Sequence, residues 1–188
     1  MSRQNEGGFA SRGGNKLAHA LAHFEIDPTG WTCADLGSNA GGFVDCLLRH
    51  GAERVYAIDT AYGLLDWSIR RNDRVVVMER TNALNVVLDE PVRLVTVDVA
   101  WTRQHLILPR AIDMLGPGGV IISLVKPHYE AHKRDLRNGV LPDELVEPTV
   151  AAVLERLESL RLPVVAKVES PIRGDGGNRE ILALVRGA

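Results

Sequence analysis

Four ionisable residues in this sequence stand at positions from which they could share chemistry. Asp98 interrupts the apolar stretch "LVTVDVAW", and Lys126 ends the apolar stretch "VIISLVKP". Because a charge on a buried strand is costly without a partner, we expect these two residues to form a buried ion pair. Burial and a nearby cation both lower the pKa of a lysine, so such a lysine can act as a general base near neutral pH.

Lys16 and Glu180 are the candidates for completing this site. Lys16 opens the helical stretch "NKLAHALAHF" and is a candidate for the second cation, while Glu180 begins the last strand after a glycine-rich turn. Sequence physics alone does not bring either residue to the site, and exposure to solvent is the alternative for both.

The glycine-rich stretch "DLGSNAGGFVDC", residues 35–46, predicts a ligand-binding turn, because such turns let the main chain approach a ligand and present free N–H groups. A P-loop is excluded, because its ending Gly-Lys-Ser/Thr does not follow Gly42. A dinucleotide fingerprint would need glycine at position 39, where this sequence has Asn39. A nucleoside ligand without pyrophosphate fits better, and a plain strand-to-helix turn is the alternative. Asp59 ends "RVYAID", where such folds place a carboxylate that binds ribose hydroxyls, unless it only caps a turn.

The elements that must position these residues alternate along the chain. Seven apolar runs predict strands: "WTCADLG", "RVYAID", "RVVVME", "VRLVTVDVAW", "GGVIISLVKP", "VVAKVES" and "REILALVR". Helices are predicted over 43–50, 64–71, 104–115 (kinked or begun late at Pro109) and 143–160. This alternation is typical of an α/β fold with a mostly parallel sheet, whose ligands bind beyond the carboxyl ends of the strands. The turn "PIRGDGGN" suits an antiparallel final pair.

Composition narrows the class of protein. At 188 residues and 45% hydrophobic composition, the chain suits one domain, over 15–188, after a flexible segment over 1–14. The net charge of −2 gives no global basic field, so any RNA contact must be local. Cys33 and Cys46 lack metal-site spacing and are expected to be reduced core thiols. No apolar run approaches the ~20 residues that span a bilayer, and no signal peptide is evident, which predicts a soluble cytoplasmic protein without membrane contact.

Several motifs carry a resemblance to a known family. The stretches "SRGGNKL", "DLGSNAGGFVDCLLRHGAERVYAID", "VVVMERTNA", "VDVAW", "LVKPHYE" and "SPIRGDGGNRE" resemble the TlyA and FtsJ group of RNA ribose 2′-O-methyltransferases, closest to TlyA, over nearly the whole chain. The resemblance implies a Rossmann-like class I methyltransferase: a mostly parallel seven-stranded sheet, helices on both faces and an antiparallel last strand. It implies S-adenosylmethionine as cofactor, RNA, by default ribosomal RNA, as substrate, and no metal.

The resemblance also assigns residues. It implies a catalytic tetrad of Lys16, Asp98, Lys126 and Glu180, in which Lys126 takes the proton of the 2′-hydroxyl. The implied cofactor-binding residues are Asp35, Gly37, Ser38, Asn39, Gly41, Gly42, Phe43, Asp59, Thr60, Asn82, Ala83 and Asp98. The sequence departs from the family at residues 38–40, which read Ser-Asn-Ala where the family usually has small residues or proline.

For RNA contact we expect Arg12 and the segment "PHYEAHKRDLRNGVLP", which follows the fifth strand as a mobile substrate loop. Within it, Tyr129 is expected to stack on a base, and Lys133 and Arg134 to contact phosphates. TlyA proteins carry a small RNA-binding domain before the methyltransferase, whereas this chain starts almost directly at "SRGGNKL". A separate RNA-binding partner is therefore a hypothesis, with either a monomer or a dimer.

Three other interpretations remain open from the sequence. The spacing of Tyr129 and Lys133 in "YEAHK" matches the Tyr-x-x-x-Lys of NAD(P)-dependent short-chain oxidoreductases. A non-catalytic RNA-binding or haemolysin-like protein is a second alternative, since some TlyA relatives have been called haemolysins. The histidine pairs 19/23 and 128/132 are each spaced four apart, but no third ligand is evident, so a metal site is not predicted.

Overall fold

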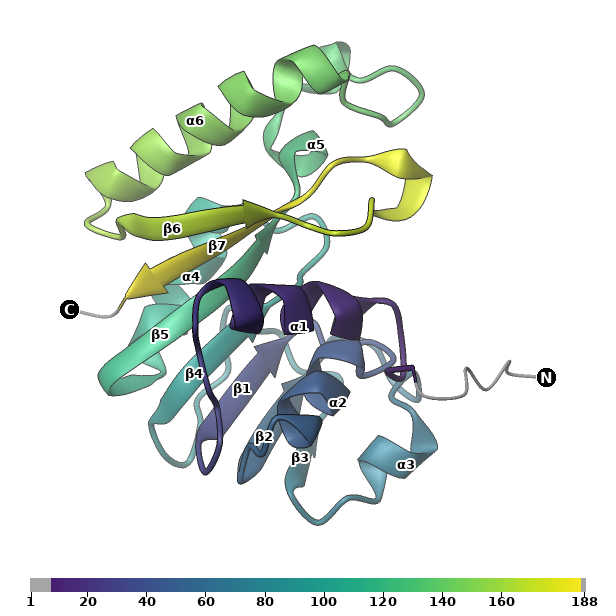
Figure 1. The fold of residues 1–188 in the computed structure, drawn as a ribbon, viewed down its shortest axis with the longest axis vertical. Helices are drawn as coiled ribbons and strands as arrows, with labels where there is room; N and C mark the ends of the chain where they lie inside the picture. Colours follow the sequence, from purple (N-terminus) through teal and green to yellow (C-terminus); the bar gives the residue numbers. More distant parts are fainter. Residues whose placement is uncertain (1–7, 187–188) are drawn as a thin grey trace.

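The computed structural model describes residues 8–186, which form one seven-stranded sheet (Figure 1). The strand order is β3-β2-β1-β4-β5-β7-β6. The strands are β1 (Thr32–Leu36), β2 (Arg54–Ile58), β3 (Val75–Met78), β4 (Val92–Val97), β5 (Leu115–Val125), β6 (Val164–Glu169) and β7 (Ile181–Arg186). Strands β1 to β5 pair in parallel, whereas β7 is antiparallel to both β5 and β6. The predicted seven strands and the antiparallel last strand are confirmed.

Helices cover both faces of the sheet. They are α1 (Gly13–His23), α2 (Gly42–Arg49), α3 (Trp67–Arg70), α4 (Gln104–Asp113), α5 (Pro127–Glu130) and α6 (Asp143–Ser159), with short 3-10 turns η1 (Lys133–Asp135) and η2 (Asp175–Gly177). Successive strand residues point to opposite faces, so Ile122 packs in the cluster under α1 and α2 while Ile121 packs in the cluster under α4 and α6. The central strands β1, β2, β4 and β7 are buried on both sides, which explains their nearly continuous apolar runs, whereas the edge strands β3 and β6 are partly exposed.

Several helix predictions need correction. The helix predicted over 64–71 is only α3, because the side chain of Asp66 accepts a hydrogen bond from the Ser68 N–H and caps the helix there. The helix predicted over 104–115 begins at Gln104 with Pro109 inside it, and Leu115 already belongs to β5. Helix α5 and turn η1 lie in the segment expected to be a substrate loop.

The amino-terminal segment contributes to the fold at its end. Residues 1–7 of the predicted 1–14 segment lie outside the described residues, and α1 already begins at Gly13. Helix α1 packs on α2 at very close range: a Cβ atom on Gly42 would lie 2.1 Å from the Ser11 Oγ and 2.9 Å from the Gly14 N. Glycine at position 42 therefore sets how closely the start of α1 approaches the start of α2.

This contact predicts the effect of Gly42→Ala on stability. The added methyl group must displace backbone of α1, so the free energy of unfolding should fall by about 1–3 kcal/mol. Gly116→Ala is the matched control, because a Cβ there meets Pro91 at an ordinary 3.5 Å. Urea denaturation of the three proteins measures both changes, and an equal loss in the two variants would contradict the packing argument.

Candidate active site

The predicted polar residues meet at one edge of the sheet. Asp98 directly follows β4, Lys126 directly follows β5, and Asp59 directly follows β2, while Asp35 lies within β1 near its carboxyl end. A cavity of about 340 Å³ opens at this edge. Among the sequence-predicted residues, it is lined by Arg12, Lys16, Asp35, Gly37, Ser38, Asn39, Gly42, Phe43, Asp98, Lys126, Tyr129 and Glu180.

Two ion pairs line this cavity. The Lys126 Nζ lies 2.6 Å from the Asp98 Oδ1 and also donates a hydrogen bond to the Val99 carbonyl oxygen at 3.2 Å. The Lys16 Nζ donates to the Glu180 Oε2 at 2.5 Å. The expected pair of Asp98 and Lys126 is present, and the structure adds the second pair, which the sequence could not supply. Burial raises the pKa of the Glu180 carboxyl, and Lys16 and then Lys126 counteract part of that rise.

Asp35 is the most deeply buried carboxyl group of the cavity. The Thr96 hydroxyl donates to its Oδ1 at 2.6 Å, whereas its Oδ2 has no hydrogen-bond partner. Burial raises the pKa of Asp35 to about 8, because the hydrogen bond from Thr96 offsets only part of the desolvation and the negative charges of Asp98 and Asp59 act in the same direction as burial. At neutral pH this shift favours the protonated form of Asp35, and its unpartnered Oδ2 is available for a ligand contact.

A second cavity, of about 280 Å³, continues from the first. The two share Gly37, Asn39 and Asp98 among their lining residues. Predicted cofactor residues Asp59, Thr60, Asn82 and Ala83 line the second cavity together with the apolar residues Ile58, Leu64, Leu84, Trp101 and Ile107. Apolar walls with a few polar groups are typical of a small-molecule site.

The glycine turn joins the two cavities. Gly37 has a positive φ of 92°, and a Cβ there would lie 2.6 Å from the Asp98 carbonyl oxygen, so only glycine fits. The Asn39 N–H donates to the Asp59 Oδ2 at 2.8 Å, and the Ala61 N–H donates to its Oδ1 at 2.7 Å. These two bonds fix the orientation of the Asp59 carboxylate. Gly41 lines neither cavity; it is the N-cap of α2 and lies against Ile69 and Leu65.

The four residues expected to contact RNA separate into two groups. Arg12 and Tyr129 line the first cavity, and the Tyr129 ring lies 5.0 Å from the Trp101 ring. Lys133 and Arg134 are exposed in η1 and line neither cavity. Helix α5 ends at Glu130, so Tyr129 and Lys133 do not share a helix. This arrangement does not support the short-chain oxidoreductase hypothesis.

Sequence reasoning missed several residues of the cavities, among them Trp101 and His128. Trp101 lines the second cavity although its side chain is largely exposed, and His128 lines the first cavity. The signal that could have identified them is their position in the sequence, because Trp101 closely follows Asp98 and His128 closely follows Lys126. Within residues 8–186, no cluster of three or more His, Cys, Asp or Glu side chains is placed to hold a metal ion. Over the same residues, no helix is both long and apolar enough to cross a membrane.

The sheet order, its antiparallel β7 and a two-part cavity at the carboxyl edge define a Rossmann-like methyltransferase domain. Residues 9–186 match the family described as FtsJ-like methyltransferase. The chain belongs to this family, whose methyl donor is S-adenosylmethionine.

Relatives and solved structures agree with this assignment. The chain is 38% identical to the candidate rRNA methyltransferase YqxC of Bacillus subtilis, over 93% of this chain and 64% of YqxC. It is 37% identical to the 16S/23S rRNA (cytidine-2′-O)-methyltransferase TlyA of Mycobacterium tuberculosis, over 97% of this chain and 70% of TlyA. The chain therefore spans about two thirds of the length of these relatives.

Among solved structures, a candidate hemolysin from Lactococcus lactis is 37% identical with a TM-score of 0.91, over 96% of this chain and 89% of that chain. The N-methyltransferase NodS of Bradyrhizobium japonicum, in complex with S-adenosylhomocysteine, has a TM-score of 0.65 at 16% identity, over 98% of this chain and 91% of that chain. This second likeness shows the fold alone.

The buried Asp35 predicts how stability changes with pH. Its pKa of about 8 in the folded protein lies above the ordinary 3.8, so the folded state keeps a proton that the unfolded chain releases. The contribution of Asp35 to stability is therefore fully present below about pH 4 and is lost as the pH rises to about 8, by at most about 1.4 kcal/mol per pH unit. Asp35→Asn, which mimics the neutral acid, should remove this dependence.

Urea denaturation across this pH range, without added ligand, measures the difference between wild type and Asp35→Asn. The variant should gain stability relative to wild type as the pH rises. Asp113→Asn is the control, because Asp113 is exposed on α4. Parallel pH profiles for wild type and Asp35→Asn would show that Asp35 is already ionised in the folded protein.

Proposed function

We propose that this chain transfers a methyl group from S-adenosylmethionine to a ribose 2′-hydroxyl of ribosomal RNA, with Lys126 as the general base. The observation that carries the proposal is the Lys126–Asp98 pair, which shares one cavity with the Lys16–Glu180 pair. Relatives named as rRNA methyltransferases support RNA as the substrate and the ribose as the target. An rRNA substrate also agrees with the expected cytoplasmic location.

The residues of the two cavities fit the cofactor. The second cavity offers apolar walls for adenine, Asn82 and Ala83 at its edge, and the fixed Asp59 carboxylate for the ribose hydroxyls. In the first cavity, Gly37 lets the backbone approach the methionine part, and the unpartnered Asp35 Oδ2 is available for a polar group of the cofactor. When bound, S-adenosylmethionine supplies an electrophilic methyl group on a positively charged sulfur.

The hydrogen bonds of Lys126 support its role as the base. In the neutral amine, two N–H groups would have acceptors in the Asp98 Oδ1 and the Val99 carbonyl oxygen. The nitrogen lone pair would then be available for the proton of the 2′-hydroxyl. As this proton reaches Nζ, the carboxylate of Asp98 stabilises the ammonium that forms. Lys16 and Glu180 would hold the ribose, since their pair lines the same cavity.

RNA binding would depend on local cations, because the net charge is −2. We place Arg12 and Tyr129 at the reacting nucleotide, since both line the cavity, and Lys133 and Arg134 further along the strand of RNA. Because these cations are so few, we favour a separate RNA-binding partner that would supply the remaining affinity for RNA.

Asp59→Ala should weaken the binding of S-adenosylmethionine by tenfold or more. The carboxylate both orients the glycine turn through Asn39 and is proposed to bind ribose hydroxyls, and water replaces neither contact. Isothermal titration calorimetry measures the dissociation constants of wild type, Asp59→Ala and the surface control Asp113→Ala. Equal affinity in Asp59→Ala, or no binding by wild type, would contradict the proposed cofactor site.

Lys126→Ala should abolish methyl transfer while S-adenosylmethionine binding persists, because the side chain acts on the ribose and not on adenosine. Radiolabelled cofactor is incubated with ribosomal subunits and with naked rRNA, and the RNA is then hydrolysed in alkali. Since alkaline cleavage needs a free 2′-hydroxyl, ribose methylation yields labelled dinucleotides that resist alkali. Lys126→Arg, which keeps the charge but cannot release its proton, should also be inactive.

Label in alkali-sensitive nucleotides or in protein would exclude ribose as the target. Near-normal turnover of Lys126→Ala with ribose-labelled product would keep the reaction and exclude Lys126 as its base.

A further inference from the structure

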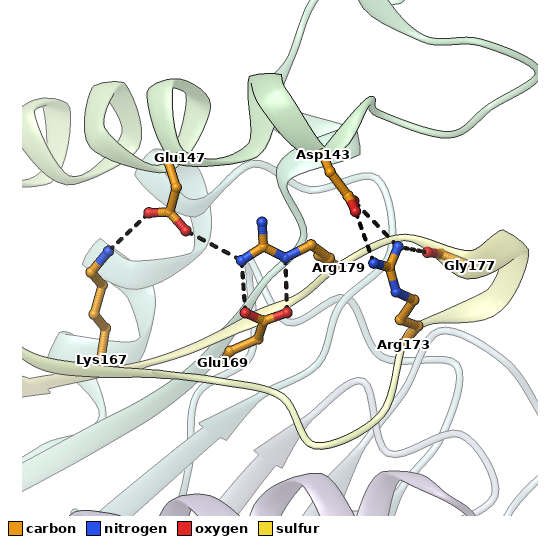
Figure 2. Close-up of polar contacts among 7 residues, drawn as sticks. All are labelled: Asp143, Glu147, Lys167, Glu169, Arg173, Gly177 and Arg179. Atoms are coloured by element: carbon orange, nitrogen blue, oxygen red, sulfur yellow. Dashed lines mark hydrogen bonds and ion pairs between the residues drawn. The ribbon is translucent and has the colours of Figure 1, made fainter.

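The β6–β7 hairpin carries a network of ion pairs on the side that faces α6 (Figure 2). The Arg179 guanidinium donates to both carboxylate oxygens of Glu169, at 2.8 and 2.7 Å, and to the Glu147 Oε1 at 3.4 Å. Arg173 forms a two-point contact with Asp143, at 2.9 and 3.3 Å, and donates to the Gly177 carbonyl oxygen at 2.9 Å. This network lies outside both cavities of the candidate active site.

Each arginine directly precedes a residue that determines where the Glu180 carboxylate lies. Arg173 precedes Gly174, where a Cβ atom would lie 2.2 Å from the Glu180 Oε1, so the backbone of the turn forms a wall against the carboxylate. Arg179 precedes Glu180 itself. Because successive residues of an extended chain point to opposite sides, a side chain of residue 179 bound on the α6 side directs residue 180 away from α6, toward Lys16.

Helix α6 supplies the fixed points of this network. Asp143 and Glu147 are four residues apart, hence neighbours on one face of the helix, and each binds one of the two arginines. Val146 and Val150 of α6 are buried in the core, so the helix is anchored to the sheet. The Arg179 side chain is only 19% exposed, and two-point arginine–carboxylate contacts restrict orientation more strongly than single ones.

We propose that Arg179, through its two-point contact with Glu169 and its contact with Glu147, is a positioning residue that aims Glu180 at Lys16. The inference rests on the proposed function, in which the Lys16–Glu180 pair holds the ribose. Arg173 holds the facing wall of the turn in the same way. Arg179 touches neither cavity, so its loss acts on the rate of transfer and leaves the cofactor site intact.

Kinetics with radiolabelled S-adenosylmethionine and ribosomal subunits test this role. Arg179→Met keeps the length of the side chain and should lower kcat by about five- to tenfold, with an unchanged dissociation constant for the cofactor. Glu169→Met should have a similar effect, and the double variant should lose no more than either single variant, since both remove one interaction. Arg179→Lys, which keeps the charge and one contact, should recover part of the rate.

Lys167→Met is the matched control, because Lys167 also pairs with Glu147 but lies in β6 away from Glu180. It should leave kcat within twofold of wild type. A kcat for Arg179→Met within twofold of wild type, or losses that add fully in the double variant, would overturn the proposal.

A second measurement separates this inference from the proposed function. A double-mutant cycle of Lys16→Met and Glu180→Gln, read from urea denaturation, gives the coupling free energy of that pair without any substrate. Repeated in the Arg179→Met background, the coupling should fall to less than half. An unchanged coupling overturns the positioning role, whereas a wild-type protein without ribose methylation, but with reduced coupling, overturns only the proposed function.

Discussion

Charges at the ends of buried strands need partners, and this requirement shapes the whole reaction edge. Strands β4 and β5 are parallel neighbours, so the residues that follow them, Asp98 and Lys126, emerge side by side. Their contact at 2.6 Å lets the sheet end in two charges that remain largely out of water. The glycine at position 37 packs directly against the Asp98 backbone, so the turn that joins the two cavities depends on the same strand end.

The antiparallel β7 brings the second ion pair to this edge. In a strand that runs against its neighbours, the residue before the strand, not the one after it, lies beside the carboxyl ends of the parallel strands. Glu180 directly precedes β7 and therefore lies near Lys126, which follows β5. Lys16 reaches Glu180 from α1, which packs tightly on α2 through Gly42. The last strand and the first helix thus close a site that the parallel strands begin.

Local sequence patterns were sufficient for the strands but not for every helix. Branched apolar runs such as "VRLVTV" of β4 identify buried strands because both faces are covered. Helix α5 has four residues, too few to show helical periodicity, and α3 was overestimated because the Asp66 cap was not recognised. The Asp98–Lys126 pair followed from apolar flanks. The Lys16–Glu180 pair joins residues 164 positions apart, so only the resemblance to a family suggested it before the fold was known.

The charge balance of the cavity favours the proposed reaction. With Asp35 protonated, the two ion pairs carry no net charge between them. If Lys126 gives up its proton, the four paired residues carry a net charge of −1, which complements a positively charged sulfur. In the proposed reaction, methyl transfer would remove the positive charge from sulfur while the 2′-hydroxyl proton would restore the charge of Lys126. The total charge of the site would therefore be conserved, and a water-poor cavity would not oppose the reaction.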